Sequence, residues 1–232
     1  MPDIIAGVPV LMAAPHRPNG AGPPPVVLWL HGFRADALAN AAELQRIADA
    51  GFLAVGVDAV GHGRRADDDL VARIDASPTG AFPVMLAAAF ATAAEIPALL
   101  REIDARGLGD NTRAGLVGVS MGAFAVYRAV QTVPVRAAVA LLGAPGWPAT
   151  GKVREAPRVA HRDLALLSIT AERDERVPPH AARAFHERLA ADPDGPMAHR
   201  YRELPGAPHL VDATGWETMM RETVEWLVTH LR

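Results

Sequence analysis

The chain of 232 residues contains no cysteine. Disulfide bonds, thiolate metal sites and a cysteine nucleophile are therefore excluded. A large excess of either charge is also lacking, because 21% of the residues are charged but the formal net charge is only −3. A basic excess that would suit nucleic acid is absent, and so is an acidic block typical of a disordered tail. The first residues show no basic segment followed by a long apolar stretch, so we expect no signal peptide.

Long hydrophobic runs are scarce as well. The longest candidate, around Met85 to Ala94, is rich in alanine and is followed by Glu95 and Pro97. It is shorter than the roughly 20 residues that a membrane-spanning helix needs. Half of all residues are hydrophobic, which is enough for a well-buried core at this length. We expect one cytoplasmic domain over residues 1–232 that binds neither nucleic acid nor membrane and could form a homodimer.

Short apolar runs alternate with longer helical stretches along the chain. This pattern predicts an α/β fold with a mostly parallel central sheet and helices on both faces. Strands are expected at 8–13 (an edge strand), 26–30, 53–57, 115–119, 135–142, 165–170 and 200–204. Helices are expected at 35–50, 82–106 (bent at Pro97), 122–131, 180–191 and 215–231, with a loop over 61–80. Residues 143–164 leave room for one short helix, so we expect no large cap domain. A modest cover could come from residues 61–82, and one wall of a site from the loop around Trp147 and Pro148.

The most informative stretch is Gly118-Val119-Ser120-Met121-Gly122, between an apolar run and a helix-forming segment. Such a string fits a sharp strand-to-helix turn that holds the serine hydroxyl at the tip of a sheet. Glycines are needed two residues either side because the turn presses backbone atoms together. A serine hydroxyl is a poor nucleophile at neutral pH, so it needs a base, and the base needs an orienting acid.

Two downstream loops supply these groups. Asp174 follows a predicted strand and precedes Pro178 and Pro179; Glu172 is an alternative acid on the same loop. His209 lies between the last predicted strand and the last predicted helix, flanked by small and apolar residues. The remaining candidate histidines are expected to be solvated: His16, His161, His180, His186, His199 and His230.

In chain order these residues are Ser120, Asp174 and His209, which is the order of the α/β-hydrolase triad. The chain therefore resembles the α/β-hydrolase fold superfamily, from Val26 to Arg232. His31-Gly32-Phe33 resembles the H-G-x oxyanion turn of that family. The resemblance implies that the backbone N–H groups of Phe33 and Met121 hold the oxyanion and that His31 is structural.

Asp58-Ala59-Val60-Gly61-His62-Gly63 resembles the D-x-x-G-H-G loop of the same family. The resemblance implies that Asp58 and His62 brace the floor of the site, while Gly32, Gly118 and Gly122 shape its turns. The side chains of Phe33 and Met121 could line an acyl pocket or simply pack in the core.

The arginines and acidic residues near these motifs leave alternatives open. Arg34, Arg64 and Arg65 could be solvated, which is the more common case, or lie near the mouth and favour a carboxylate-bearing substrate. The run Asp67-Asp68-Asp69 has no partner ligands at metal spacing, so it is expected to be solvated. We expect neither a metal nor a cofactor.

The residues favour a serine hydrolase that cleaves a small-molecule carboxylic ester through an acyl-enzyme. A second possibility is a peptidase or aminopeptidase related to prolyl-oligopeptidase catalytic domains. A third is a non-catalytic small-molecule binding protein on a hydrolase scaffold, because fold alone does not dictate function.

Overall fold

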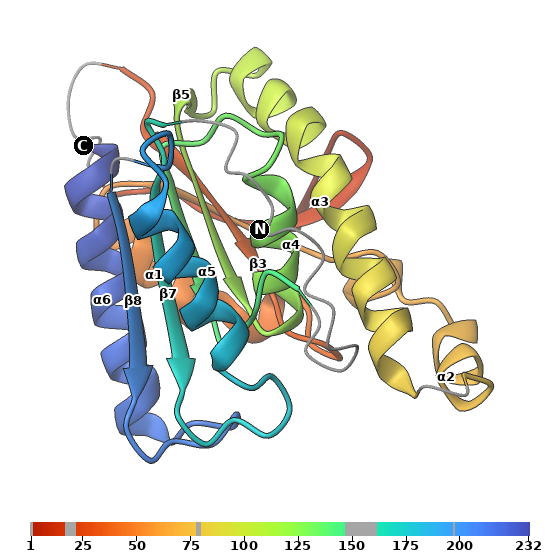
Figure 1. Ribbon diagram of the computed structural model, residues 1–232. Coiled ribbons are helices and arrows are strands. Elements are labelled where there is room, and N and C mark those ends of the chain that lie inside the picture. The colour runs from red at the N-terminus through yellow and green to blue at the C-terminus, as the bar shows by residue number, and fades with distance from the viewer. Residues whose placement is uncertain (1, 17–21, 78–79, 147–161, 197) are drawn as a thin grey trace.

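The computed structural model describes residues 2–16, 22–77, 80–146, 162–196 and 198–232 (Figure 1). Its centre is an eight-stranded sheet with the strand order β1-β2-β4-β3-β5-β6-β7-β8. The strands are β1 (Pro2–Ile5), β2 (Val8–Ala13), β3 (Pro25–Leu30), β4 (Leu53–Val57), β5 (Asp110–Val119), β6 (Ala137–Leu141), β7 (Ala165–Ala171) and β8 (Ala198–Leu204). The six strands from β4 to β8 in that order are parallel, whereas β2 is antiparallel to both of its neighbours.

Helices cover both faces of the sheet, as predicted (Figure 1). Side chains of α3 (Ala81–Ala105), α4 (Met121–Ala129) and α5 (His180–Ala191) form one apolar core with one face. Side chains of α1 (Ala41–Asp49) and α6 (Ala213–Leu231) form a second core with the other. The central strands β3, β4, β6 and β7 are buried along their whole length. This burial explains the continuous apolar sequences of β3, β4 and β6, whereas β7 also carries the buried polar residues Ser168 and Thr170.

The sheet edge differs from the prediction. Residues 8–13 form a strand, but β1 lies outside it, so β2 is not the edge. Ala6 and Gly7 join the two strands with positive φ angles of 49° and 77°. A two-residue turn of this kind matches the twist of a hairpin. We did not predict β1 because a segment of only four residues is too short to be recognised as a strand from its sequence.

Two helical predictions also need correction. The segment expected as one helix from Ala35 to Ala50 is a 3₁₀ turn, η1 (Leu38–Asn40), followed by α1. The α-helix begins late because carboxylates capture the earlier amides: Asp58 accepts from Ala37 N and Asp36 from Ala39 N. The expected loop over 61–80 contains η2 (Gly63–Arg65) and the helix α2 (Asp69–Asp75).

The remaining predicted elements within the described residues are present; 53–57 and 180–191 agree with β4 and α5 at both ends, and the others have shifted ends. The strand that leads to Ser120, for example, begins at Asp110 rather than Gly115. Helix α3 continues through Pro97 as one element. By length and composition α3 could cross a membrane, but 44% of its most apolar window is buried inside the protein. The expected short helix before residue 165 and the wall around Trp147 and Pro148 lie outside the described residues.

The carboxyl ends of the parallel strands share one edge, toward which the arrowheads of β3, β7 and β8 point in Figure 1. Within the described chain, four non-glycine residues have a positive φ, and three of them follow strands at this edge: Arg34, Ser120 and Leu142. Such backbone is costly for L residues and gathers where a loop must aim groups at a site.

Candidate active site

The turn after β5 aims Ser120 out of the sheet. Ser120 has φ 52° and precedes the first residue of α4, and its own N–H donates to Leu141 O on β6 at 2.8 Å. The two glycines are required by backbone contact. A Cβ added at Gly118 would lie 2.2 Å from Gly122 O, and one added at Gly122 would lie 2.0 Å from Leu30 O. The strand-to-helix turn read from the sequence is therefore present with its steric cause.

The structure brings the three predicted residues together at this edge. Ser120 Oγ lies 3.0 Å from His209 Nε2, and His209 Nδ1 lies 2.6 Å from Asp174 Oδ2. Since a carboxylate can only accept, Nδ1 carries the proton and Nε2 accepts from the serine hydroxyl. Ser120 and His209 are 89 residues apart in the chain, and His209 and Asp174 are 35 apart.

The loop after β7 fixes the carboxylate. Asp174 is buried, and its other oxygen accepts hydrogen bonds from the N–H groups of Arg176 and Val177 at 3.0 and 2.8 Å. These two amides were not singled out from the sequence, although an Asp followed by a turn often bonds backbone two or three residues on. The His209 side chain is 10% exposed, so bulk water has little access to the imidazole.

The alternative acid is engaged elsewhere. Glu172 is exposed and its Oε2 accepts from Gly206 N at 2.5 Å, which ties the acid loop to the turn that precedes His209. Arg173 N adds a second link to the same turn through Ala207 O at 2.9 Å. Of the two candidate carboxylates, the structure places only Asp174 against the imidazole.

The H-G-x turn lies beside the nucleophile. A Cβ on Gly32 would be 3.9 Å from Ser120 Cβ. In the described part of the chain, neither Phe33 N nor Met121 N donates to a protein acceptor, and Met121 N is one of the free amides at the start of α4. Both amides are thus available beside Ser120. The Met121 side chain is buried in the core, and Phe33 packs partly against that core.

His31 serves as a brace between two loops. Its Nε2 accepts from Ala59 N at 3.0 Å and its Nδ1 contacts Gly32 O at 2.8 Å, so the ring is neutral with its proton on Nδ1. Burial lowers the pKa of His31, which agrees with this neutral form. The arrangement connects the end of β3 to the end of β4.

Asp58 and His62 lie in the segment after β4 that His31 contacts through Ala59 N. Asp58 accepts from the N–H groups of Ala37 and Arg64 at 2.9 and 3.0 Å, so one carboxylate ties two loops together. His62 is buried beside the rings of His31 and Phe33, and its Nδ1 contacts Val60 O at 3.0 Å. Its Nε2 is buried without a hydrogen-bond partner in the described structure.

One histidine was misread from the sequence. His186, expected to be solvated, is buried, with Nε2 2.8 Å from Ser168 Oγ, which in turn lies 2.7 Å from Tyr127 Oη. The sequence held a signal for this, because His186 continues the apolar stripe of Ala182, Phe185 and Leu189 on α5. His161 lies outside the described residues.

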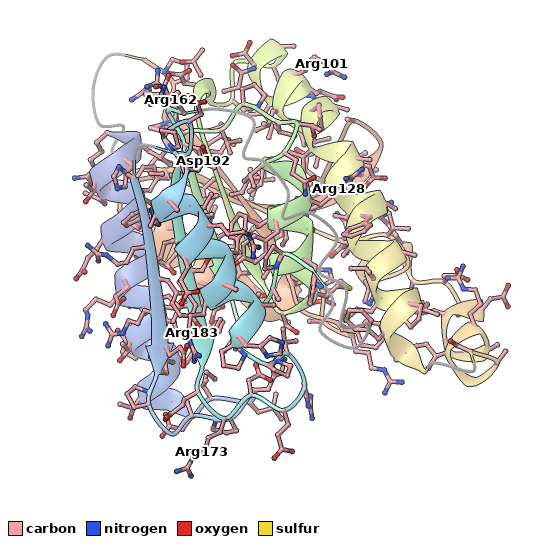
Figure 2. The ribbon with its side chains drawn as sticks, viewed as in Figure 1. Arg101, Arg128, Arg162, Arg173, Arg183 and Asp192 are labelled. Atoms are coloured by element: carbon pink, nitrogen blue, oxygen red, sulfur yellow. The ribbon has the colours of Figure 1, made fainter. Side chains whose placement is uncertain are left out.

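A cavity of about 430 Å³ lies away from this site. It is lined by the first residues of β5, by residues just before β6 and β7, and by α3, including Arg101, Asn111, Arg136 and Asp163. Figure 2 shows Arg101 at one end of the molecule and Arg173, next to Asp174, at the other. The cavity is therefore separate from the Ser120 constellation. Among the described residues, no group of three or more His, Asp or Glu side chains is placed to hold a metal ion.

Comparison with known proteins adds a family and a fold. The profile of the alpha/beta hydrolase family matches residues 27–230. "Putative esterase YitV" of Bacillus subtilis is 28% identical over 144 residues, which are 62% of this chain and 53% of that protein. The matched stretch thus spans about half the length of this curated relative.

Two solved structures show the same architecture. A cold-adapted esterase from an Arctic intertidal metagenomic library has a TM-score of 0.70 and 19% identity, over 100% of this chain and 93% of that one. A puromycin-hydrolyzing peptidase of Mycobacterium tuberculosis has a TM-score of 0.73 and 17% identity, over 100% of this chain but 40% of its own. At such identities the likeness shows a shared fold.

Proposed function

Since this chain belongs to the alpha/beta hydrolase family, we propose that it is a serine hydrolase acting on small carboxylic esters. The observation that carries the proposal is the continuous relay of hydrogen bonds from Ser120 through His209 to Asp174. The esterase-named relative and the esterase of the same fold agree with this reaction class.

The proposed reaction uses these residues as follows. Ser120 Oγ attacks the acyl carbon while His209 Nε2 takes its proton, and Asp174 stabilises the imidazolium that results. The backbone N–H groups of Phe33 and Met121 donate hydrogen bonds to the carbonyl oxygen as it becomes negatively charged. One such donor is typically worth about 10²–10³ in rate. His209 then returns the proton to the leaving alcohol. Water, deprotonated by the same imidazole, releases the acyl group from Ser120.

The test is substitution of the nucleophile. Ser120→Ala should lower kcat for p-nitrophenyl acetate by at least about 10³-fold and abolish labelling by a fluorophosphonate probe. Ser168→Ala is a matched control, because Ser168 also contacts a histidine but is fully buried. The control should keep both activity and labelling. Undiminished turnover by the Ser120→Ala protein would overturn the proposal, and an unlabelled wild-type protein that retains a small molecule would favour a binding protein.

A peptidase is the second candidate, because the fold also matches part of a puromycin-hydrolyzing peptidase. The match covers only 40% of that protein, so the remaining part of the peptidase has no matched counterpart in this chain. Paired substrates that differ only in an ester or an amide bond separate the two functions. Comparable kcat/KM for both bonds would favour the peptidase, whereas a strong ester preference favours the esterase.

A further inference from the structure

Arg34, Arg64 and Arg65 lie in the segments that follow β3 and β4, and the structure pairs two of them with other parts of the protein. Arg64 donates through Nη2 to Asp3 O and Val10 O, and its Nε lies 3.6 Å from Asp58. It therefore fastens the outer strands β1 and β2 to the floor of the site. Arg65 forms a two-pronged ion pair with Glu95 of α3 at 2.8 Å for each prong. Neither guanidinium is free to meet a substrate charge.

Arg34 is different. Its side chain is exposed, and its guanidinium carbon lies 5.7 Å from the centre of the Phe33 ring. In the described part of the chain it forms no ion pair with a carboxylate. The nearest acid in sequence, Asp36, accepts from Ala39 N. Arg34 also has φ 62°, a conformation that a non-glycine residue adopts at a cost.

The position of Arg34 relates it to one half of the substrate. It directly follows Phe33, whose amide is proposed to hold the oxyanion, and Gly32 lies against Ser120. In the sheet, β3 lies on one side of β5, while β7 and β8, which lead to Asp174 and His209, lie on the other. The leaving alcohol must be close to His209 Nε2, which protonates it. The acyl part of the ester is therefore the part that faces the Arg34 side.

We propose that Arg34 makes this enzyme selective for esters whose acyl group carries a carboxylate, that is, half-esters of short dicarboxylic acids. The inference rests on the proposed ester hydrolysis at Ser120. An arginine with no internal acid keeps its donors for a substrate, and its planar fork matches a carboxylate with two parallel hydrogen bonds. The Phe33 ring holds the guanidinium by a cation–π contact, which limits the conformations it must give up on binding.

The experiment compares two esters with acyl chains of five carbons, monomethyl glutarate and methyl pentanoate, by titration of the acid released. The wild-type protein should favour the anionic ester in kcat/KM, and added KCl should reduce that preference by screening. Arg34→Gln should lower the ratio of the two kcat/KM values about tenfold, mainly through KM of the half-ester. Arg34→Lys should restore part of the ratio, since it keeps the charge but not the fork.

The matched control is Arg128→Gln. Arg128, on α4, is also exposed, with its guanidinium carbon 5.6 Å from the centre of the Phe90 ring. Figure 2 shows it away from the end of the molecule where Arg173, next to Asp174, lies. The control removes the same charge and the same kind of contact, so its ratio should equal that of the wild type. The inference would be overturned if Arg34→Gln left the ratio of the two kcat/KM values unchanged, or if Arg128→Gln lowered that ratio by the same factor. Hydrolysis that persists in Ser120→Ala would instead overturn the proposed function.

Discussion

At the level of single residues, Asp174 shows how a site carboxylate is selected from several candidates. The acid loop carries Glu172, Asp174 and Glu175, and composition alone does not rank them. The structure gives Asp174 two backbone donors on one oxygen and the imidazole on the other. Glu172 instead joins the acid loop to Gly206. The two acids thus have separable tasks.

Asp174→Asn tests that division. Asparagine retains an oxygen for the amides of Arg176 and Val177, so the loop should keep its shape. It presents a neutral amide to His209, which loses the charge that fixes the reactive tautomer, and kcat should fall about 10³–10⁴-fold. Glu172→Gln, which still accepts from Gly206 N, should stay within about threefold of wild type because it touches no reacting group. The opposite order of the two variants in ester hydrolysis assays would make Glu172 the orienting acid.

The sequence identified the three relay residues because their types and chain order are distinctive. It could not choose among Arg34, Arg64 and Arg65, which look alike in the chain. The choice depends on partners from distant segments: Glu95 on α3 for Arg65, and the carbonyls of Asp3 and Val10 for Arg64. Such pairings exist only once the outer strands and α3 have packed.

At the level of elements, α5 is joined to its neighbours by a buried polar chain. Ser168 on β7 contacts both Tyr127 on α4 and His186 on α5, and His186 Nδ1 lies 3.2 Å from His199 Nδ1 on β8. Burial, together with the smaller effect of the neighbouring His199, lowers the pKa of His186 to about 3. Burial raises the pKa of Tyr127, so both rings stay neutral at neutral pH.

This lowered pKa predicts acid sensitivity. The unfolded chain binds a proton at His186 near pH 6.5 and the folded chain only near pH 3, so stability is full above the first value and falls as pH drops. Between these two pH values, the protonation of His186 should lower the free energy of unfolding by about 1.4 kcal/mol for each unit by which the pH falls. His186→Phe should show a shallower decline between pH 6 and pH 4 in urea unfolding, by about that slope. Parallel pH curves for the two proteins would contradict the assignment.

Elements were predictable where one signal dominated. The buried strands β3, β4 and β6 stand out as continuous apolar runs, and α5 begins directly after Pro178 and Pro179. Helix α2 was missed because Asp67, Asp68 and Asp69 make its start look like a solvated loop. Its buried Leu70 provides the packing that decides for a helix, and one leucine in a polar stretch is a weak signal.

At the level of the whole molecule, the convergence of distant residues follows from topology. Parallel strands place all their carboxyl ends at one edge, so loops after β3, β5, β7 and β8 must meet there. This is why the meeting of Ser120, Asp174 and His209 could be expected from their residue types and chain order. The outer hairpin of β1 and β2 was not expected, because it depends on a turn at Ala6 and Gly7 with two positive φ angles.

Helix α3 bears on where the protein resides, because its length and apolarity alone would let it cross a membrane. Three of its polar side chains are bonded to neighbouring segments of the protein. Thr92 accepts from Val60 N, Glu95 pairs with Arg65, and Glu102 accepts from Ala6 N at 2.7 Å. These bonds fasten the helix at three levels to the segments around β1, β2 and β4. A bilayer-spanning position would break all three and expose charged groups to lipid.

We therefore expect α3 to remain packed in the protein and the chain to be released from cell membranes by alkaline carbonate. After extraction of cells that express the full chain, the protein should appear in the supernatant while an integral membrane protein of the host stays in the pellet. Recovery in the pellet together with that marker would contradict the expectation. Because α3 contacts α4, which begins at the turn that carries Ser120, a helix withdrawn into a bilayer would also remove support from Ser120. Ester hydrolysis in the supernatant fraction should accordingly match the amount of protein found there.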